Sequence, residues 1–147
     1  MHSVTIPSEL GKVQAAVIYC SDGRYGTATE RFLQGSLSLP LYDRLVFPGG
    51  AGCLGSHPAT WRAAEVLMEA LRLLVSEHGL RRVVLVAHDD CAFYVKRLSI
   101  PAAEAKERQL ADLRTAADRI RSCGVLEVEA WFAQRVEDGV RFEAVPL

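Results

Sequence analysis

The stretch RRVVLVAHDDC, residues 81–91, gives the clearest structural signal in the chain. Residues 81–87 are apolar almost throughout, which is typical of a strand buried on both faces, and polar side chains follow at once. Residues 14–20 form a second short apolar run, and residues 43–47 form a further predicted strand that a Pro-Gly-Gly sequence ends. Because buried strands joined by helices make parallel sheets covered on both sides, this pattern predicts a three-layer α/β fold with a mainly parallel sheet.

Two helices are predicted between these strands. The first is short, contains Ala28, and ends near Gly35. The second runs from Pro58 to about Glu77, where apolar residues recur at three- and four-residue spacing, and Ser56 or His57 would cap it. The residues predicted to face inward on this second helix are Trp61, Ala64, Leu67, Met68, Leu71, Leu74 and Val75.

A third predicted helix runs from about residue 101 to residue 122 and is followed by a hairpin. Its predicted inward residues are Ala102, Ala105, Leu110, Leu113, Ala117 and Ile120. Arginines on this helix alternate with acidic residues, Asp112 among them, and we interpret these side chains as a solvated, charge-balanced face. Residues 125–134 and 140–145 are predicted strands, because the Asp-Gly dipeptide between them favours a tight hairpin turn.

Length and composition are those of an ordinary globular chain. Its 147 residues fit one domain covering residues 1–147, with residues 1–13 as a short N-terminal segment. The 17 basic and 18 acidic side chains leave a formal charge of −1, which gives no electrostatic footprint for nucleic acid or an anionic membrane. No apolar stretch approaches the ~18 residues of a membrane span, and the start lacks a targeting segment, so we expect a cytoplasmic protein. Four scattered cysteines are too few for a disulfide framework in a domain of this size.

Three segments with polar or reactive side chains come directly after predicted strands. They are residues 20–24 (CSDGR), residues 48–55 (PGGAGCLG) and residues 88–91 (HDDC). Because ligands bind beyond the carboxyl ends of the strands in a parallel sheet, these segments can converge on one site. The thiolates of Cys20 and Cys91 with the imidazole of His88 are a good set for zinc, which in catalytic sites commonly takes three protein ligands and keeps a fourth position open. The sequence therefore predicts one zinc site.

Two of these segments carry a family resemblance. Residues 20–24 resemble the Cys-x-Asp-x-Arg motif of the β-class carbonic anhydrases, and residues 88–91 resemble their His-x-x-Cys motif. The chain between the motifs is similar to the family as well, with a strand, a glycine-rich loop, a long helix and an apolar strand. The resemblance covers roughly residues 14–145 of the sequence.

The resemblance implies a Zn²⁺ ion bound by Cys20, His88 and Cys91, with Asp22 and Arg24 as a catalytic pair. In the family the arginine holds the aspartate away from the metal, so that water or hydroxide occupies the fourth position. Zinc lowers the pKa of bound water from about 15.7 to about 7, and an ionised Asp22 would accept a hydrogen bond from the hydroxide and orient it toward CO2. The implied activity is the reversible hydration of CO2 to bicarbonate, in a homodimer or a higher homo-oligomer.

Other interpretations compete with this one. The same zinc chemistry could act on carbonyl sulfide or carbon disulfide, as in some relatives of this fold, and ligation of Asp22 would give a closed, non-catalytic site. A metal-free thiol enzyme would use Cys20 as nucleophile and His88 as base, which leaves Cys91 without a role. Residues 50–55 match the dinucleotide pattern Gly-x-Gly-x-x-Gly, but the predicted helix begins beyond the last glycine, so its N-terminus would not meet a pyrophosphate there.

We assign the remaining cysteine and histidine side chains no role in the predicted zinc site. Cys53 and Cys123 are taken as core or incidental residues, since free cysteine is often buried. His57 is taken as a helix-capping or solvated histidine rather than a proton shuttle. The apolar residues of the segment 37–41 are a candidate contact surface between subunits, or core.

Overall fold

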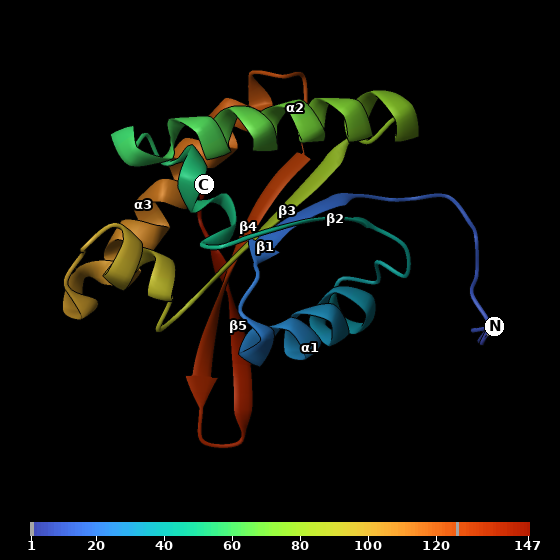
Figure 1. Ribbon diagram of the computed structural model, residues 1–147, viewed down its shortest axis with the longest axis horizontal. Helices are drawn as coiled ribbons and strands as arrows, with labels where there is room; N and C mark the ends of the chain where they lie inside the picture. The colour runs from blue at the N-terminus through green and yellow to red at the C-terminus, as the bar shows by residue number, and fades with distance from the viewer. Residues whose placement is uncertain (1, 126) are drawn as a thin grey trace.

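Figure 1 shows a computed structural model of the chain, which describes residues 2–125 and 127–147. Five strands form one sheet in the order β2-β1-β3-β4-β5. The strands are β1 (Ala16–Cys20), β2 (Asp43–Phe47), β3 (Arg82–His88), β4 (Glu127–Val136) and β5 (Gly139–Val145). Neighbouring strands are parallel from β2 through β4, whereas β5 runs antiparallel to β4. The mainly parallel sheet and the C-terminal hairpin are therefore confirmed, although residue 126 of the predicted strand 125–134 lies outside the described residues.

Helices cover both faces of this sheet. The α-helices are α1 (Gly23–Arg31), α2 (Trp61–His78) and α3 (Ala102–Arg121). Short helical turns are η1 (Phe32–Ser36) and η4 (Phe93–Arg97), both of π type, and η2 (Gly50–Leu54) and η3 (Pro58–Thr60), both of 3₁₀ type. In Figure 1, α2 and α3 lie on one side of the strands and α1 lies on the other. The predicted three-layer α/β architecture is confirmed.

Alternation along β1 explains how one short strand serves two layers. Ala16 and Ile18 are fully buried in the core that α2 and α3 share with the sheet. Val17 and Tyr19 point the other way, into the core that includes Tyr25 of α1. Successive side chains of a strand point to opposite faces, so a continuous apolar run is what two covered faces require.

Three predictions about the helix faces are wrong. Trp61 is 56% exposed, because residues 58–60 form a separate 3₁₀ turn and Trp61 begins the α-helix at its open end. Ala102, at the first turn of α3, is exposed as well. Asp112, which we expected on the solvated face, is only 3% exposed. Of the two predicted cap residues, His57 is the N-cap residue of η3, without a side-chain capping hydrogen bond, and Thr60 is the N-cap residue of α2.

The connections between strands create a switch point between β1 and β3. From β1 the chain passes through α1 to β2 on one side of β1, and from β2 it passes through α2 to β3 on the other side. Ligands of open α/β sheets bind beyond the carboxyl ends of the strands at such a point. The last residues of these two strands are Cys20 and His88. None of the helices in the described parts of the chain is long and apolar enough to span a membrane.

Candidate metal centre

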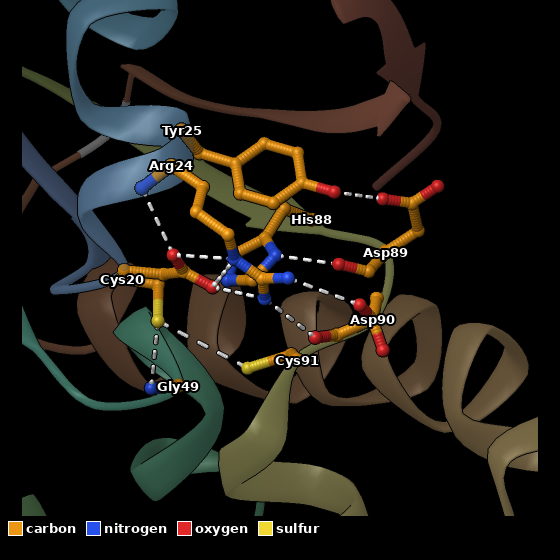
Figure 2. Close-up of polar contacts among 9 residues, drawn as sticks. Cys20, Arg24, Tyr25, Gly49, His88, Asp89, Asp90 and Cys91 are labelled. Atoms are coloured by element: carbon orange, nitrogen blue, oxygen red, sulfur yellow. Dashed lines mark hydrogen bonds and ion pairs between the residues drawn. The ribbon is translucent and has the colours of Figure 1, made fainter. Parts of the chain in front are cut away.

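The side chains of Cys20, His88 and Cys91 meet at this switch point. Cys20 ends β1, His88 ends β3, and Cys91 follows three residues after His88 (Figure 2). One potential ligand atom from each residue lies within 4.8 Å of the other two, and the two sulfurs are 4.0 Å apart. Cys91 and His88 are buried, whereas Cys20 is partly exposed. The structure thus brings together the three residues that the sequence predicted as zinc ligands.

A tight turn directs Cys91 back toward His88. Asp90 adopts a left-handed backbone conformation with φ of 53°, which aspartate tolerates better than most residues. The carbonyl oxygen of Cys91 then accepts hydrogen bonds from the backbone N–H groups of Tyr94 at 3.1 Å and Val95 at 3.3 Å. The turn and the helical segment after it therefore place both residues of the His-x-x-Cys motif around one point.

His88 has one ring nitrogen engaged and one available. Its Nδ1 lies 2.6 Å from the carbonyl oxygen of Asp89, to which it can donate, and its ring stacks on Tyr25 with centroids 4.2 Å apart. The other nitrogen, Nε2, is buried and has no hydrogen-bond partner among the described residues. Buried polar atoms are nearly always paired, so an unpaired imidazole nitrogen beside two sulfurs fits a metal ligand whose tautomer the Asp89 carbonyl fixes.

The contact between Cys20 and Cys91 shifts the pKa values of the two thiols in opposite directions. The hydrogen bond with Cys91, together with His88 and the Gly49 N–H group 3.3 Å from Cys20 Sγ, lowers the pKa of Cys20 to about 4, although burial opposes this change. The same contact with the Cys20 thiolate, and then burial, raises the pKa of Cys91. Burial lowers the pKa of His88, but the adjacent Cys20 outweighs it and the net shift is upward. A divalent cation bound between the two sulfurs would stabilise both of them as thiolates.

Asp22 and Arg24 form a closed ion pair next to the ligand group. Asp22 is the N-cap residue of α1 and accepts a hydrogen bond from the backbone N–H of Arg24. The Arg24 side chain donates from Nε to Oδ1 at 3.0 Å and from Nη2 to Oδ2 at 2.6 Å. These hydrogen bonds lower the pKa of Asp22 to about 2. Among the described residues Asp22 is not a member of the ligand group, because its carboxylate is turned to Arg24.

Arg24 also connects the two motifs. Its Nη1 lies 3.2 Å from Asp90 Oδ2, and its Nη2 lies 3.3 Å from the Asp90 carbonyl oxygen (Figure 2). The Asp90 turn is the one that directs Cys91. The arginine of the first motif therefore holds both the aspartate beside it and the turn of the second motif.

The glycine-rich segment is a packed turn. Gly52 and Gly55 are buried, and a Cβ atom added at Gly52 would lie 2.5 Å from the Tyr94 hydroxyl, while one at Gly55 would lie 2.3 Å from Asp112 Cγ. These close approaches account for two of the glycines in the Gly-x-Gly-x-x-Gly pattern without a nucleotide. The helix α2 begins only at Trp61, as the sequence argument against a dinucleotide required.

The other cysteines stay outside the ligand group. Cys53 is 3% exposed, and burial raises its pKa to about 11, so it is a core thiol, as expected. Cys123 packs partly buried against the core of α2 and α3. His57 is the N-cap residue of η3, but its side chain makes no capping hydrogen bond. The side chain is buried rather than solvated, and its Nε2 lies 2.7 Å from Asp112 Oδ2.

Sequence reasoning missed two sets of supporting residues. Asp89, the second residue of the His-x-x-Cys motif, accepts a hydrogen bond from the Tyr25 hydroxyl and another from the backbone N–H of Arg135. Asp112 bonds His57 and Tyr94. The helical register held a signal for Asp112, because it lies seven residues after the buried Ala105 on the same face.

Comparison with known structures places this fold in a class. A β-carbonic anhydrase, isoform I, of the protozoan Trichomonas vaginalis aligns with a TM-score of 0.58 at 10% identity, over 95% of this chain and 87% of its own. A tetrameric β-carbonic anhydrase of the ascomycete Sordaria macrospora aligns with a TM-score of 0.49 at 14% identity, over 93% of this chain and 83% of its own. The first of these alignments shows that the fold is that of the β-carbonic anhydrases.

The family is shown by a sequence model. The model described as "Putative carbonic anhydrase" matches residues 11–141, which is most of the chain, and the protein belongs to this family. Comparison with curated protein sequences gave no match.

Proposed function

We propose that the protein catalyses the reversible hydration of CO2 to bicarbonate, using a Zn²⁺ ion bound by Cys20, His88 and Cys91. The observation that carries this proposal is the close grouping of Cys20, His88 and Cys91, whose potential ligand atoms lie within 4.8 Å of one another, while the buried Nε2 of His88 has no hydrogen-bond partner in the described part of the chain. Thiolate sulfur and imidazole nitrogen are preferred zinc ligands, and three of them leave a fourth position. When bound, zinc in such a site lowers the pKa of a water in the fourth position to about 7.

Asp22 and Arg24 have separate tasks in this proposal. Asp22 holds a carboxylate next to the ligand group as a hydrogen-bond acceptor that can orient the attacking oxygen. Arg24 keeps that carboxylate from turning to the metal, because its Nε and Nη2 engage both carboxylate oxygens. Fork-shaped pairs of this kind are strong and directional. This contact favours a catalytic site with an open position over a closed site in which Asp22 is the fourth ligand.

The test is stopped-flow CO2 hydration by zinc-loaded protein from neutral to mildly alkaline pH. We expect activity that rises as the pH increases and that is absent from Cys91→Ser, whose zinc site is incomplete. A zinc-loaded wild type without activity over this range would contradict the proposal. Hydrolysis of carbonyl sulfide or carbon disulfide by the same sample would then assign the zinc site to another substrate.

The four cysteines also bear on the cellular setting. None of Cys20, Cys53, Cys91 and Cys123 is in a disulfide, although the sulfurs of Cys20 and Cys91 are 4.0 Å apart. Free thiols this close together persist in a reducing compartment or under a metal ion. We therefore propose a cytoplasmic location, with the small molecules CO2 and bicarbonate as substrates.

A further inference from the structure

A buried polar cluster around Asp112 lies next to the ligand segments. Asp112 belongs to α3 and is 3% exposed. Its Oδ2 accepts hydrogen bonds from His57 Nε2 at 2.7 Å and from the Tyr94 hydroxyl at 2.8 Å. The guanidinium of Arg108 pairs with the same carboxylate, with Nε 3.6 Å from Asp112 Oδ1. Burying a carboxylate costs free energy of folding unless the group is paired and hydrogen-bonded. The buried position of Asp112 therefore suggests that this side chain has a specific role.

The proton positions in this cluster follow from its donors. Arg108 Nη2 lies 3.1 Å from His57 Nδ1, and arginine has no acceptor, so Nδ1 must be the accepting nitrogen. His57 then carries its proton on Nε2 and donates it to Asp112. Tyr94 donates to the same oxygen. Each donor meets an acceptor only in this arrangement, which fixes His57 and Tyr94 relative to α3.

One arm of the cluster leads to Cys91. Tyr94 is three residues beyond Cys91, and its backbone N–H donates to the Cys91 carbonyl oxygen. Cys91, Tyr94 and Ala105 of α3 also form a packed apolar cluster. The hydroxyl bond to Asp112 therefore anchors the segment that carries one sulfur.

The other arm leads to Cys20 through η2. Gly49 donates its N–H to Cys20 Sγ at 3.3 Å, and the 3₁₀ bonds from Gly52 to Gly49 and from Gly55 to Gly52 connect this donor to the far end of the segment. That far end packs directly against Asp112 at Gly55. His57, two residues further on, ties it to the same carboxylate.

We propose that Asp112 is a positioning residue for the thiol pair, acting through Tyr94 on Cys91 and through the His57-anchored η2 segment on Cys20. This inference rests on the proposed zinc site. One carboxylate thereby fixes the separation of two sulfurs, one at the end of β1 and the other in the segment after β3. Residues that orient metal ligands typically change metal affinity by about 10–100-fold when they are replaced.

The experiment measures the rate at which zinc-loaded protein transfers zinc to an excess of a chromogenic chelator. We expect Asp112→Asn and Tyr94→Phe to release zinc at least about tenfold faster than wild type. Tyr94→Phe removes only the hydroxyl and keeps the packed ring. His57→Gln offers a donor to Asp112 and an acceptor to Arg108, so it should release zinc more slowly than His57→Ala.

Two controls separate positioning from a general loss of stability. Asp118→Asn makes the same chemical change on the same helix at a side chain that is 79% exposed, and it should release zinc at the wild-type rate. Ile120→Val weakens the buried face of α3 away from this cluster and should do the same. Wild-type rates in both Asp112→Asn and Tyr94→Phe, or equal acceleration by Ile120→Val, would overturn the positioning role alone. A wild-type chain that binds no zinc would overturn the proposed function together with it.

Discussion

Arg24 is the single side chain on which the open form of the site depends. It engages Asp22 through Nε and Nη2 and the Asp90 turn through Nη1. Arg24→Ala should release Asp22 to the metal, leave zinc bound, and reduce CO2 hydration at neutral pH at least tenfold, equivalent to about 1.4 kcal/mol of barrier. Stopped-flow rates with parallel metal analysis measure both effects. Arg31→Ala, an exposed arginine on the same helix, is the matched control, and equal activity of the two variants would contradict this role.

The thiols distinguish a zinc protein from a metal-free thiol enzyme. With zinc bound, Cys20 and Cys91 should be protected from a thiol reagent, and removal of zinc with a strong chelator should expose them. Cys53 should remain unreactive at neutral pH in both states, because burial raises its pKa to about 11 and keeps it protonated. Thiol titration of folded protein with and without chelator checks this, with Cys53→Ser as control. Full reactivity of Cys20 before chelation would favour the thiol enzyme.

Individual residues differ in how far the sequence reveals them. Cys20, His88 and Cys91 could be found because each lies at or just after the end of a predicted strand, where parallel sheets gather ligands. Asp112 could not be recognised from its charged neighbours, since its partners Tyr94 and His57 are brought to it only by the packing of α3. Local sequence patterns predict the position of a residue within a helix or strand. Contacts between distant segments of the chain determine the role of its side chain.

At the scale of elements, periodicity predicted the regular parts and missed the irregular ones. The strands and α3 were predicted within a residue or two, because their apolar patterns match a strand or helix period. The π turn η4 was not predicted, since one turn gives too few residues for a period. Two glycines of the η2 region, Gly52 and Gly55, are required because Tyr94 and Asp112 pack closely against them. A local sequence pattern does not reveal these contacts, because Tyr94 and Asp112 are distant in the sequence.

The packing of η2 makes a prediction about its last glycine position. Gly55→Ala places a Cβ atom 2.3 Å from Asp112 Cγ, so it should lower the free energy of unfolding by about 1–3 kcal/mol, the usual cost of overpacking. Gly26→Ala, inside α1 with nothing within 4 Å of its added Cβ, should instead raise it by about 0.5–1 kcal/mol. Urea denaturation midpoints compare the two. Equal effects of both alanines would contradict the close contact.

At the scale of the whole molecule, we propose a homodimer or a higher homo-oligomer. Val4, Ile6 and Leu10 are 71%, 75% and 96% exposed, and Val46 on the edge strand β2 is 41% exposed. These apolar side chains are better candidates for a subunit contact than the segment 37–41, because Leu39 within it is buried in the core. Light scattering at micromolar concentration should give at least twice the mass of one chain. A monomer under these conditions would contradict the assembly.

The most direct test of the account is the zinc K-edge X-ray absorption spectrum of wild-type protein purified without chelator. Cys20, His88 and Cys91 predict about one zinc per chain, with two sulfur neighbours at about 2.3 Å and nitrogen or oxygen neighbours at about 2.0–2.1 Å. In Cys20→Ser and Cys91→Ser the sulfur shell should shrink or the metal should be lost, whereas Cys123→Ser should leave the spectrum unchanged. Protein without zinc, or a spectrum that keeps both sulfurs in Cys20→Ser and in Cys91→Ser, would contradict the assignment of this site.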